Sequence, residues 1–181
     1  MDLSSFNTNG FDRGRPVWVE ALWMMVQALF VSSWLPGSLH RKCLLRAFGA
    51  RIGRGAVLKP RLRVKFPWKL TLGEHVWLGE GVWIDNLAPV EIGSNVCVSQ
   101  EAYLCTGSHD WGSSQFDLAV RPIRLADCVW ICARATLAPG TSVGEGSVVA
   151  LGAVASGELA SWQVYAGVPA AVVRARSIPD H

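Results

Sequence analysis

His109 is the residue of this sequence best placed for acid–base chemistry. It precedes Asp110 and stands where a regular six-residue pattern gives way to a segment without repeats, so we expect it at a corner of the repeat with a loop beside it. Histidine titrates close to neutral pH, and its imidazole can accept the proton of an attacking hydroxyl group. Asp110 is expected either to orient the imidazole or to cap a loop turn. We therefore take His109 as a candidate general base and Asp110 as its candidate partner.

The other groups that could do chemistry give weaker signals. His75 follows a glycine corner, where a side chain is expected to face solvent. The cysteines are an odd number without metal-ligand spacing: Cys43, Cys97, Cys105, Cys128 and Cys132. Such cysteines indicate reduced thiols in a cytosolic protein, and no metal is expected.

The element that must position these residues is a six-residue repeat. Each group of three hexads is followed by two extra residues, so Ile52-Gly53, Leu72-Gly73 and Ile92-Gly93 recur every 20 residues. The pattern breaks at 106–124 and then resumes. Aliphatic residues occupy the first position of every hexad: Ile52, Leu58, Val64, Leu72, Leu78, Ile84, Ile92, Val98, Leu104, Leu125, Ile131, Leu137, Val143 and Val149.

A period of six predicts a triangular coil of three short strands and three tight turns, with the aliphatic residue pointing inward. Stacked coils bury one another's apolar residues, which gives a parallel β-helix. The glycine that often follows the aliphatic residue suits a corner with little room for a side chain or one that needs a positive φ. The fifth position of most hexads holds a small or β-branched residue, but Leu62 and Trp68 occupy it early in the repeat. We therefore expect an irregular first coil covered by the N-terminal segment. An antiparallel sandwich would instead alternate with period two.

Residues 17–35 (VWVEALWMMVQALFVSSWL) are apolar enough to suggest membrane contact. Their length is at the lower limit for a spanning helix, and Glu20 and Gln27 share one helical face. Trp18, Trp23 and Trp34 near the ends are typical of a helix in a membrane interface. An interfacial helix, a helix packed on the protein body and a true span all remain open. A second short helix is expected after Pro36 and Gly37.

Charge is distributed unevenly in the N-terminal third. No acidic residue occurs between Glu20 and Glu74, whereas ten basic residues do. This predicts a basic surface that fits an anionic membrane, and no nucleic-acid motif accompanies it. The N-terminus lacks the pattern of a secretory signal peptide, so we expect a cytoplasmic protein with peripheral contact to the inner face of the cytoplasmic membrane. The expected organisation is a helical segment at 1–51, a β-helix at 52–176 with a protruding loop at 106–124, and a tail at 177–181.

Three strings in the chain resemble the hexapeptide-repeat acyltransferases, and within them the colanic-acid biosynthesis acetyltransferase group. They are LLRAFGARIG at 44–53, FPWKLTLGEHVWLGEGVWIDNLAPVEIGSNVCVSQEAYLCTGSHD at 66–110 and VYAGVPAAVVR at 164–174. The resemblance implies an all-β fold, a left-handed parallel β-helix with an N-terminal helical segment, despite the right-handed rule for ordinary parallel crossovers. It also implies a homotrimer with active sites between subunits.

The resemblance also implies roles for individual residues. His109 matches the catalytic histidine of the family. Asp85 and Asn86 lie where related sugar acetyltransferases bind their acceptor, although an Asx-type corner turn is the alternative. Trp111 and Phe116, in the loop at 106–124, are expected to line the acceptor pocket or to pin the loop to a neighbour.

The donor expected from the resemblance is acetyl-CoA, bound as a co-substrate along the later coils. The matching residues are Trp130, Ala133, Leu151, Gly152 and Ser156. Gly157 and Ala171 stand where many relatives have a basic residue, so part of the usual phosphate contact is missing. Arg174 and Arg176 are the remaining cationic candidates.

The expected activity is O-acetylation of a sugar hydroxyl in exopolysaccharide biosynthesis, on a saccharide or lipid-linked oligosaccharide. Two other classes of function remain open. A non-catalytic trimeric scaffold would bind no CoA. A γ-class carbonic anhydrase would need three zinc-binding histidines, and only His75 and His109 fall in the body of the repeat.

Overall fold

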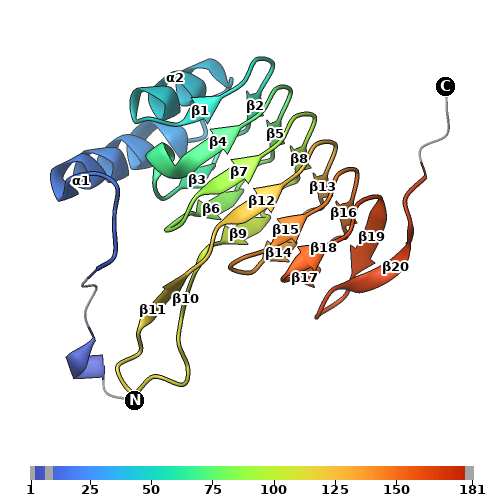
Figure 1. Cartoon of the computed structure of the whole chain (residues 1–181). Coiled ribbons are helices and arrows are strands. Elements are labelled where there is room, and N and C mark those ends of the chain that lie inside the picture. The colour runs from blue at the N-terminus through green and yellow to red at the C-terminus, as the bar shows by residue number, and fades with distance from the viewer. Residues whose placement is uncertain (1–2, 7–9, 178–181) are drawn as a thin grey trace.

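The chain forms a triangular solenoid of stacked coils, with helices over its N-terminal end (Figure 1). The computed structural model describes residues 3–6 and 10–177. Of the predicted tail at 177–181, only Ser177 lies inside these ranges. Successive coils pair through parallel strands, as the six-residue period predicts.

Each side of the triangle is a sheet of very short strands, and we number the three faces in chain order. The first face contains β1 (Arg51–Ile52), β4 (Leu70–Leu72), β7 (Val90–Ile92), β12 (Ile123–Leu125), β15 (Ser142–Val143) and β18 (Glu158–Leu159). The second contains β2 (Val57–Leu58), β5 (Trp77–Leu78), β8 (Cys97–Val98), β13 (Trp130–Ile131), β16 (Val148–Val149), β19 (Gln163–Ala166) and β20 (Ala171–Ala175). The third contains β3 (Arg63–Val64), β6 (Trp83–Asp85), β9 (Tyr103–Cys105), β14 (Thr136–Leu137) and β17 (Val154–Ala155).

The aliphatic first positions of the hexads stack into three buried columns, one behind each face. On the second face, Leu58, Leu78, Val98, Ile131 and Val149 are in register. All five side chains are at most 1% exposed. Burying such a side chain contributes about 1.5 to 3 kcal/mol, so the columns stabilise the solenoid.

The corner glycines are required by close packing between coils rather than by a positive φ. A Cβ on Gly53 would lie 2.4 Å from the carbonyl oxygen of Gly73, and a Cβ on Gly73 would lie 2.6 Å from the carbonyl carbon of Gly93. The positive φ angles fall two positions later in the hexad, as at Gly55 and His75. Of the two reasons predicted for these glycines, only the lack of room is correct.

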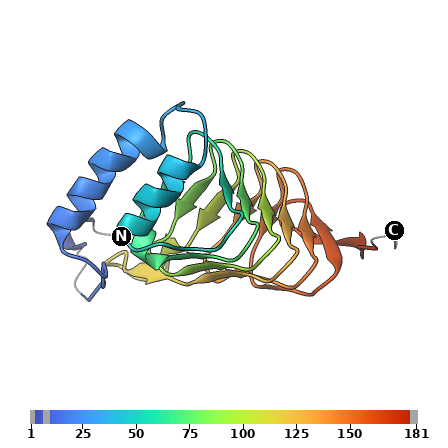
Figure 2. The same cartoon turned by 90° about the horizontal axis from the view of Figure 1, so that it is seen from above.

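Two helices cover the first coil (Figure 2). The predicted helix at 17–35 is shorter than expected, because α1 (Val17–Val26) continues only through the π-helical turn η2 (Gln27–Val31). The second helix is α2 (Leu39–Ala47). Two short 3-10 helices, η1 (Leu3–Ser5) and η3 (Pro67–Lys69), complete the helical elements. Within the described residues, no helix is both long and apolar enough to cross a membrane.

Polar side chains of the helical segment bond the outer backbone groups of the first coil. The indole nitrogen of Trp23 donates to the Val64 carbonyl at 2.7 Å, and the side-chain oxygen of Gln27 accepts from the Val64 amide at 2.6 Å. The hydroxyl of Ser38 bonds both the amide and the carbonyl of Leu58. The first coil is therefore covered by specific hydrogen bonds as well as by apolar packing.

Arg41 ties the end of the first helix to the second. Its buried guanidinium donates to the carbonyl oxygens of Val31, Ser33 and Leu35 at 2.9, 2.7 and 2.8 Å, and also to that of Gly37. Burial lowers the pKa of Arg41 from its usual value. These carbonyl groups lie where a helix end leaves its acceptors unpaired, so the arginine serves as their donor.

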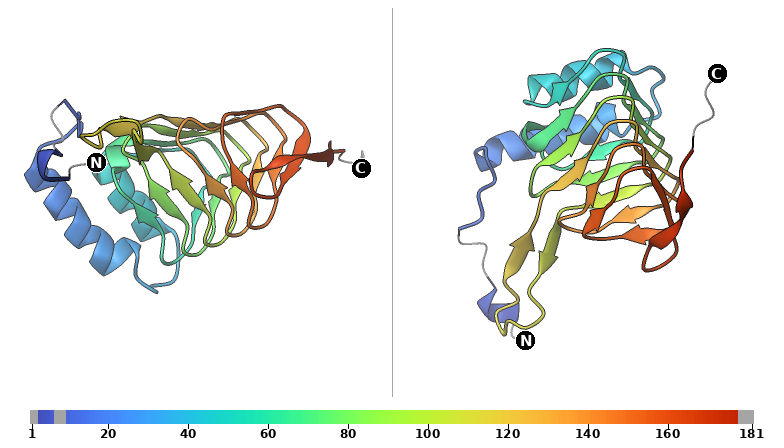
Figure 3. Two further views of the ribbon diagram at one scale, coloured as in Figure 1. Left: turned by 90° about the horizontal axis from the view of Figure 1, so that it is seen from below. Right: turned by 45° about the vertical axis from the view of Figure 1, so that its right-hand side comes forward.

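The non-repeating segment at 106–124 projects from the prism as a hairpin. It consists of β10 (Gly107–His109) and β11 (Leu118–Val120), which pair antiparallel. It leaves the solenoid at the third corner, between the third and first faces, and runs toward the N-terminal segment (Figure 3). At the far end of the solenoid, β20 turns back and pairs antiparallel with β19.

Candidate functional site

His109 lies on the hairpin, not at a coil corner as predicted. It is the last residue of β10 and pairs with Leu118 of β11. Its ring stacks on Phe116, with centroids 3.8 Å apart and planes 8° from parallel. Phe6 of the N-terminal segment meets the same ring edge-on at 5.5 Å. The imidazole is thus held between the hairpin and the start of the chain.

The hydrogen bond at Nδ1 fixes which nitrogen of His109 can act as a base. Nδ1 lies 2.8 Å from the carbonyl oxygen of Phe116. A carbonyl oxygen only accepts, so Nδ1 must carry the hydrogen. In the neutral ring this leaves a free lone pair on Nε2, which has no hydrogen-bond partner among the described residues. The ring is therefore oriented to accept a proton at Nε2.

Asp110 caps the hairpin turn, which is one of its two predicted roles. Its Oδ1 accepts from the amide of Gly112 at 2.8 Å, and its own amide donates to the carbonyl of Asp117. The group that orients His109 is the backbone of Phe116, so the prediction that Asp110 orients the ring is corrected. Trp111 is 93% exposed in this turn.

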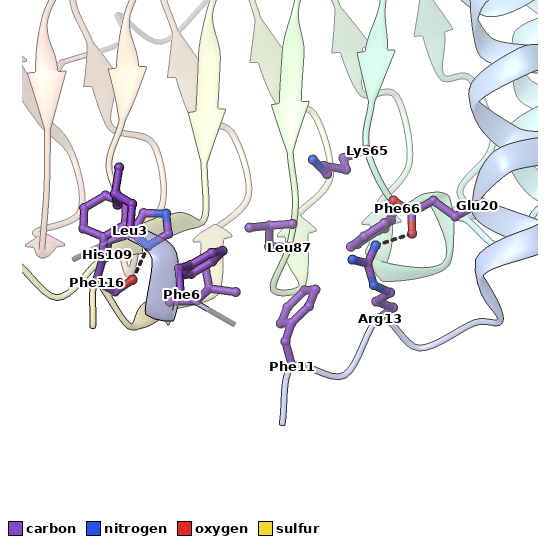
Figure 4. Close-up of a pocket in the computed structure, with 11 residues that line it drawn as sticks. Leu3, Phe6, Phe11, Arg13, Glu20, Lys65, Phe66, Leu87, His109 and Phe116 are labelled. Carbon is purple, nitrogen blue, oxygen red and sulfur yellow. Dashed lines mark hydrogen bonds and ion pairs between the residues drawn. The ribbon is translucent and has the colours of Figure 1, made fainter. Parts of the chain in front are cut away.

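Two cavities meet at His109, one on each side of the hairpin. The first, of about 430 Å³, extends from His109 and Phe116 past Leu87 and Phe66 to Arg13 and Glu20 (Figure 4). The second, of about 620 Å³, is lined by Ser108, His109, Asp110, Trp111, Gly112, Ala119, Arg121 and Pro139. The first therefore opens toward the early coils and the second toward the later ones, with His109 lining both.

Charged side chains lie at the end of the first cavity away from His109. Arg13 and Glu20 form an ion pair of 2.6 Å there. Lys65 lines the same cavity, on the coil before Asp85. The first cavity thus combines an aromatic end at His109 with a charged end near α1.

Asp85 ends β6 and Asn86 follows it at the third corner, but the two residues have different environments. Asn86 is fully buried, and its amide bonds both the amide and the carbonyl of Phe66 at 2.9 and 2.7 Å. This is a structural role, so the expectation that Asn86 binds the acceptor is corrected. Asp85 accepts from the Tyr103 hydroxyl at 3.3 Å, while its Oδ1 has no partner in the described part of the chain. Burial, with Cys105 and Asp85 nearby, raises the pKa of Tyr103.

The residues expected to bind the donor do not gather around His109 within one chain. Trp130 lies on the second face, and Ala133, Leu151 and Gly152 occupy turns between the second and third faces. Ser156 follows β17 at the third corner, the same corner as the hairpin. A site that uses His109 together with Trp130 therefore needs residues from different corners of the prism.

The two cationic candidates for the donor phosphates differ in their surroundings. Arg174 is exposed on β20. Arg176 donates to the carbonyls of Cys128 and Gly146 at 2.9 and 2.7 Å, so it fastens the C-terminal segment to the solenoid. This corrects the expectation that Arg176 is free to bind phosphate.

Sequence reasoning missed Phe6, Arg13, Lys65 and Arg121 as cavity residues. Phe6 and Arg13 lie far from His109 in the sequence, and nothing in the repeat brings them to it. Arg121 carried a signal, since it falls in the hairpin segment next to the candidate base. Within the described residues, no group of three histidine, cysteine or acidic side chains lies close enough to hold a metal ion.

The chain is similar in sequence to known acetyltransferases. A protein of Escherichia coli strain K12, provisionally named a colanic acid biosynthesis acetyltransferase (WcaF), is 39% identical over 179 residues, which cover 97% of each chain. The galactoside O-acetyltransferase of the same strain is 24% identical over 137 residues, which cover 74% of this chain and 68% of that protein. No protein-family model matches the chain.

Solved structures share the architecture at low sequence identity. A hexapeptide-repeat acetyltransferase of Vibrio cholerae, in complex with acetyl coenzyme A, superposes with a TM-score of 0.84 at 20% identity and covers 98% of this chain and 100% of that one. A galactoside acetyltransferase in complex with coenzyme A gives a TM-score of 0.78 at 21% identity, over 89% and 82% of the two chains. These likenesses confirm the predicted left-handed parallel β-helix.

Proposed function

Because this chain belongs to the hexapeptide-repeat acetyltransferases, we propose that it transfers the acetyl group of acetyl-CoA to a sugar hydroxyl, with His109 as the general base. The observation that carries the choice of base is the contact of Nδ1 with the Phe116 carbonyl, which leaves the Nε2 lone pair free where two cavities meet. A general base must reach the acceptor hydroxyl as that hydroxyl attacks the thioester, so we assign one cavity to each substrate, with His109 shared by both.

The reaction follows from this position. Nε2 takes the proton of the acceptor hydroxyl as its oxygen attacks the thioester carbonyl carbon. The tetrahedral intermediate collapses with cleavage of the carbon–sulfur bond, and the imidazolium returns its proton to the departing thiolate. The Phe116 carbonyl accepts from Nδ1–H and so fixes the orientation and tautomer of the ring, as the carboxylate does in a catalytic triad, but without a negative charge.

The first cavity is the proposed acceptor side. Aromatic and polar groups together suit a sugar, because sugar rings stack on aromatic faces and their hydroxyls need partners. Phe6 and Phe11 supply rings, and Lys65 supplies a hydrogen-bond donor. Asp85 does not line the first cavity, and we keep it as a predicted acceptor ligand because a hydroxyl donor would satisfy its unpaired Oδ1.

The second cavity is the proposed donor side, completed by a partner subunit in a homotrimer. The second and third faces carry exposed or half-exposed aromatic side chains, namely Trp77, Trp130, Trp83 and Tyr103. The first face instead carries the solvated pair Arg124 and Glu91. Packing of one subunit's second face beside another's third corner would bring Trp130, Ala133, Leu151 and Gly152 to His109. Arg174 and Arg121 would supply cations for CoA phosphates.

The process that we infer is exopolysaccharide biosynthesis in the cytoplasm. Support comes from the 39% identity to the protein named for colanic acid biosynthesis, which extends over 97% of both chains. The saccharide acceptor is proposed on this basis and on the character of the first cavity.

Acetyl transfer can be tested directly. Purified full-length protein is incubated with acetyl-CoA and exopolysaccharide oligosaccharides, thiol release is followed, and the product is examined for an O-acetyl group. Acetyl-CoA alone should raise the melting temperature by mass action, and zinc should not replace it. A protein that neither binds acetyl-CoA nor releases thiol with any saccharide would contradict the proposal in favour of a non-catalytic scaffold.

A further inference from the structure

We propose that the outer face of α1 docks the protein on an anionic lipid membrane, beside the charged end of the first cavity. The acceptor would then be a saccharide attached to a membrane lipid. The docking surface stands on its own observations, whereas the lipid-attached acceptor rests on the proposed function.

The docking surface is an apolar stripe along α1 and η2. Trp18, Leu22, Met25 and Leu29 are spaced by four, three and four residues, which places them on one helical face. They are between 41% and 69% exposed. Isolated exposed apolar residues are normal, but a continuous stripe on a helix marks an interaction surface.

The polar side chains of α1 and η2 form hydrogen bonds and an ion pair with other parts of the protein. Glu20 pairs with Arg13, and Gln27 bonds the Val64 amide. No charged residue belongs to the outward stripe, and Trp18 and Trp34 lie near its two ends with exposed rings. Indole rings at both ends are typical of a helix that lies in the headgroup region of a bilayer.

The charge around the stripe favours an anionic lipid surface over a second copy of this chain. Arg15 precedes α1 and Arg46 is exposed on α2, and neither pairs with an acidic side chain in the described part of the chain. Arg61, whose guanidinium lies 5.4 Å from the ring of Trp34, is paired with Glu80 at 3.6 Å. The only acidic residue of the helical segment at 17–47, Glu20, is already paired. A second copy would bring like charges together, whereas anionic headgroups would neutralise them.

The apolar stripe lies near the charged end of the first cavity, so docking would bring the membrane close to the proposed acceptor site. Arg13 and Glu20 line the first cavity where α1 begins, and His109 lies at its other end (Figure 4). A membrane against Trp18 would therefore lie next to the charged end of the cavity. A sugar anchored to a lipid in that membrane could extend along Leu87 to Nε2 of His109.

Vesicle flotation of the full-length protein tests the docking surface. Wild type should float with phosphatidylglycerol-containing vesicles, float less with phosphatidylcholine alone, and lose binding as salt is raised. The double variant Leu22→Glu/Leu29→Glu should lower the partition coefficient at least about tenfold, because it removes apolar contact and adds negative charge. Val172→Glu/Val173→Glu is the matched control, since both are exposed apolar residues on β20 at the far end of the solenoid.

Several results would overturn the proposal. If the wild-type protein does not bind phosphatidylglycerol vesicles, the proposal is overturned, whether or not the variants fold. Equal flotation of the wild type and the double variant would also overturn the proposal. So would a double variant whose only change is in the oligomeric state measured by sedimentation. Acetylation of a free soluble oligosaccharide should be unchanged by Leu22→Glu/Leu29→Glu. A wild type that floats but acetylates no saccharide would refute the proposed function and the lipid-attached acceptor while leaving the docking surface standing.

Discussion

Replacing His109 separates its role in proton transfer from its role in holding the hairpin. In His109→Asn the side-chain amide can still donate toward the Phe116 carbonyl, but no base remains at the position of Nε2. The lost ring had stacked on Phe116 at 3.8 Å, a contact of about 1 kcal/mol on a hairpin outside the buried columns. For a chain of this size that lowers the melting temperature by roughly 2 to 4 °C. The solenoid and its affinity for CoA should therefore survive.

Turnover should fall much further than stability. Loss of a general base costs roughly 10² to 10⁴ in rate, which corresponds to about 3 to 5 kcal/mol of activation free energy. Thiol release from acetyl-CoA in the presence of acceptor gives the rate, and calorimetry gives the CoA affinity. His75→Asn is the control, because His75 is exposed at a φ of 56°, a conformation that asparagine tolerates.

The reasoning about the base is refuted by one pattern of results. If His109→Asn turns over within about tenfold of wild type while binding CoA normally, another group removes the proton. If His75→Asn loses activity while His109→Asn keeps it, the active site lies at His75, one corner and one coil away from the proposed position.

Three further predictions follow from the packing. A 1:1 mixture of His109→Ala and Ala133→Trp subunits, reassembled into trimers, should regain roughly a quarter of wild-type activity if each site uses two subunits, because about one site in four then combines an intact His109 with an intact Ala133. If each site uses one subunit, almost no activity should return. Sedimentation should give about three times 19.6 kDa. Gly73→Ala should lower the free energy of unfolding by about 1 to 3 kcal/mol in denaturant titration, because its Cβ meets backbone, whereas Gly112→Ala should be near neutral. Arg41→Met should cost about 3 kcal/mol, since buried carbonyls lose a charged donor, and thermal unfolding measures it.

The sequence was most informative where the fold repeats. A residue such as Leu78 has the same neighbours in every coil, so its burial follows from the period and from the need to stack coils. Leu62 and Trp68, whose bulk would crowd a regular interior, predicted an irregular first coil, but β1, β2 and β3 pair in regular register with the next coil and only η3 interrupts it. Leu62 is in fact fully buried beneath the helical segment.

The sequence was less informative where the partner of a side chain is a backbone atom. The group that orients His109 is a backbone carbonyl seven residues away. Because every residue has a backbone carbonyl, the sequence does not indicate which one is the partner. Arg176 and Asn86 looked like surface groups for the same reason, since their partners are also carbonyl and amide groups of distant residues. Phe6 contacts the ring of His109 although about a hundred residues separate them, and no local pattern encodes that contact.

The bonded first coil and the reversed last strand give the solenoid a fixed length. A stack of parallel strands with an open edge can template further strands from other molecules, which leads to fibrous polymers. Here Trp23, Gln27 and Ser38 occupy the edge of the first coil, and β20 presents an antiparallel edge after β19. The helical segment thus also keeps the molecule from growing end to end. A chain that begins at Arg51 should self-associate into elongated particles rather than yield a smaller enzyme.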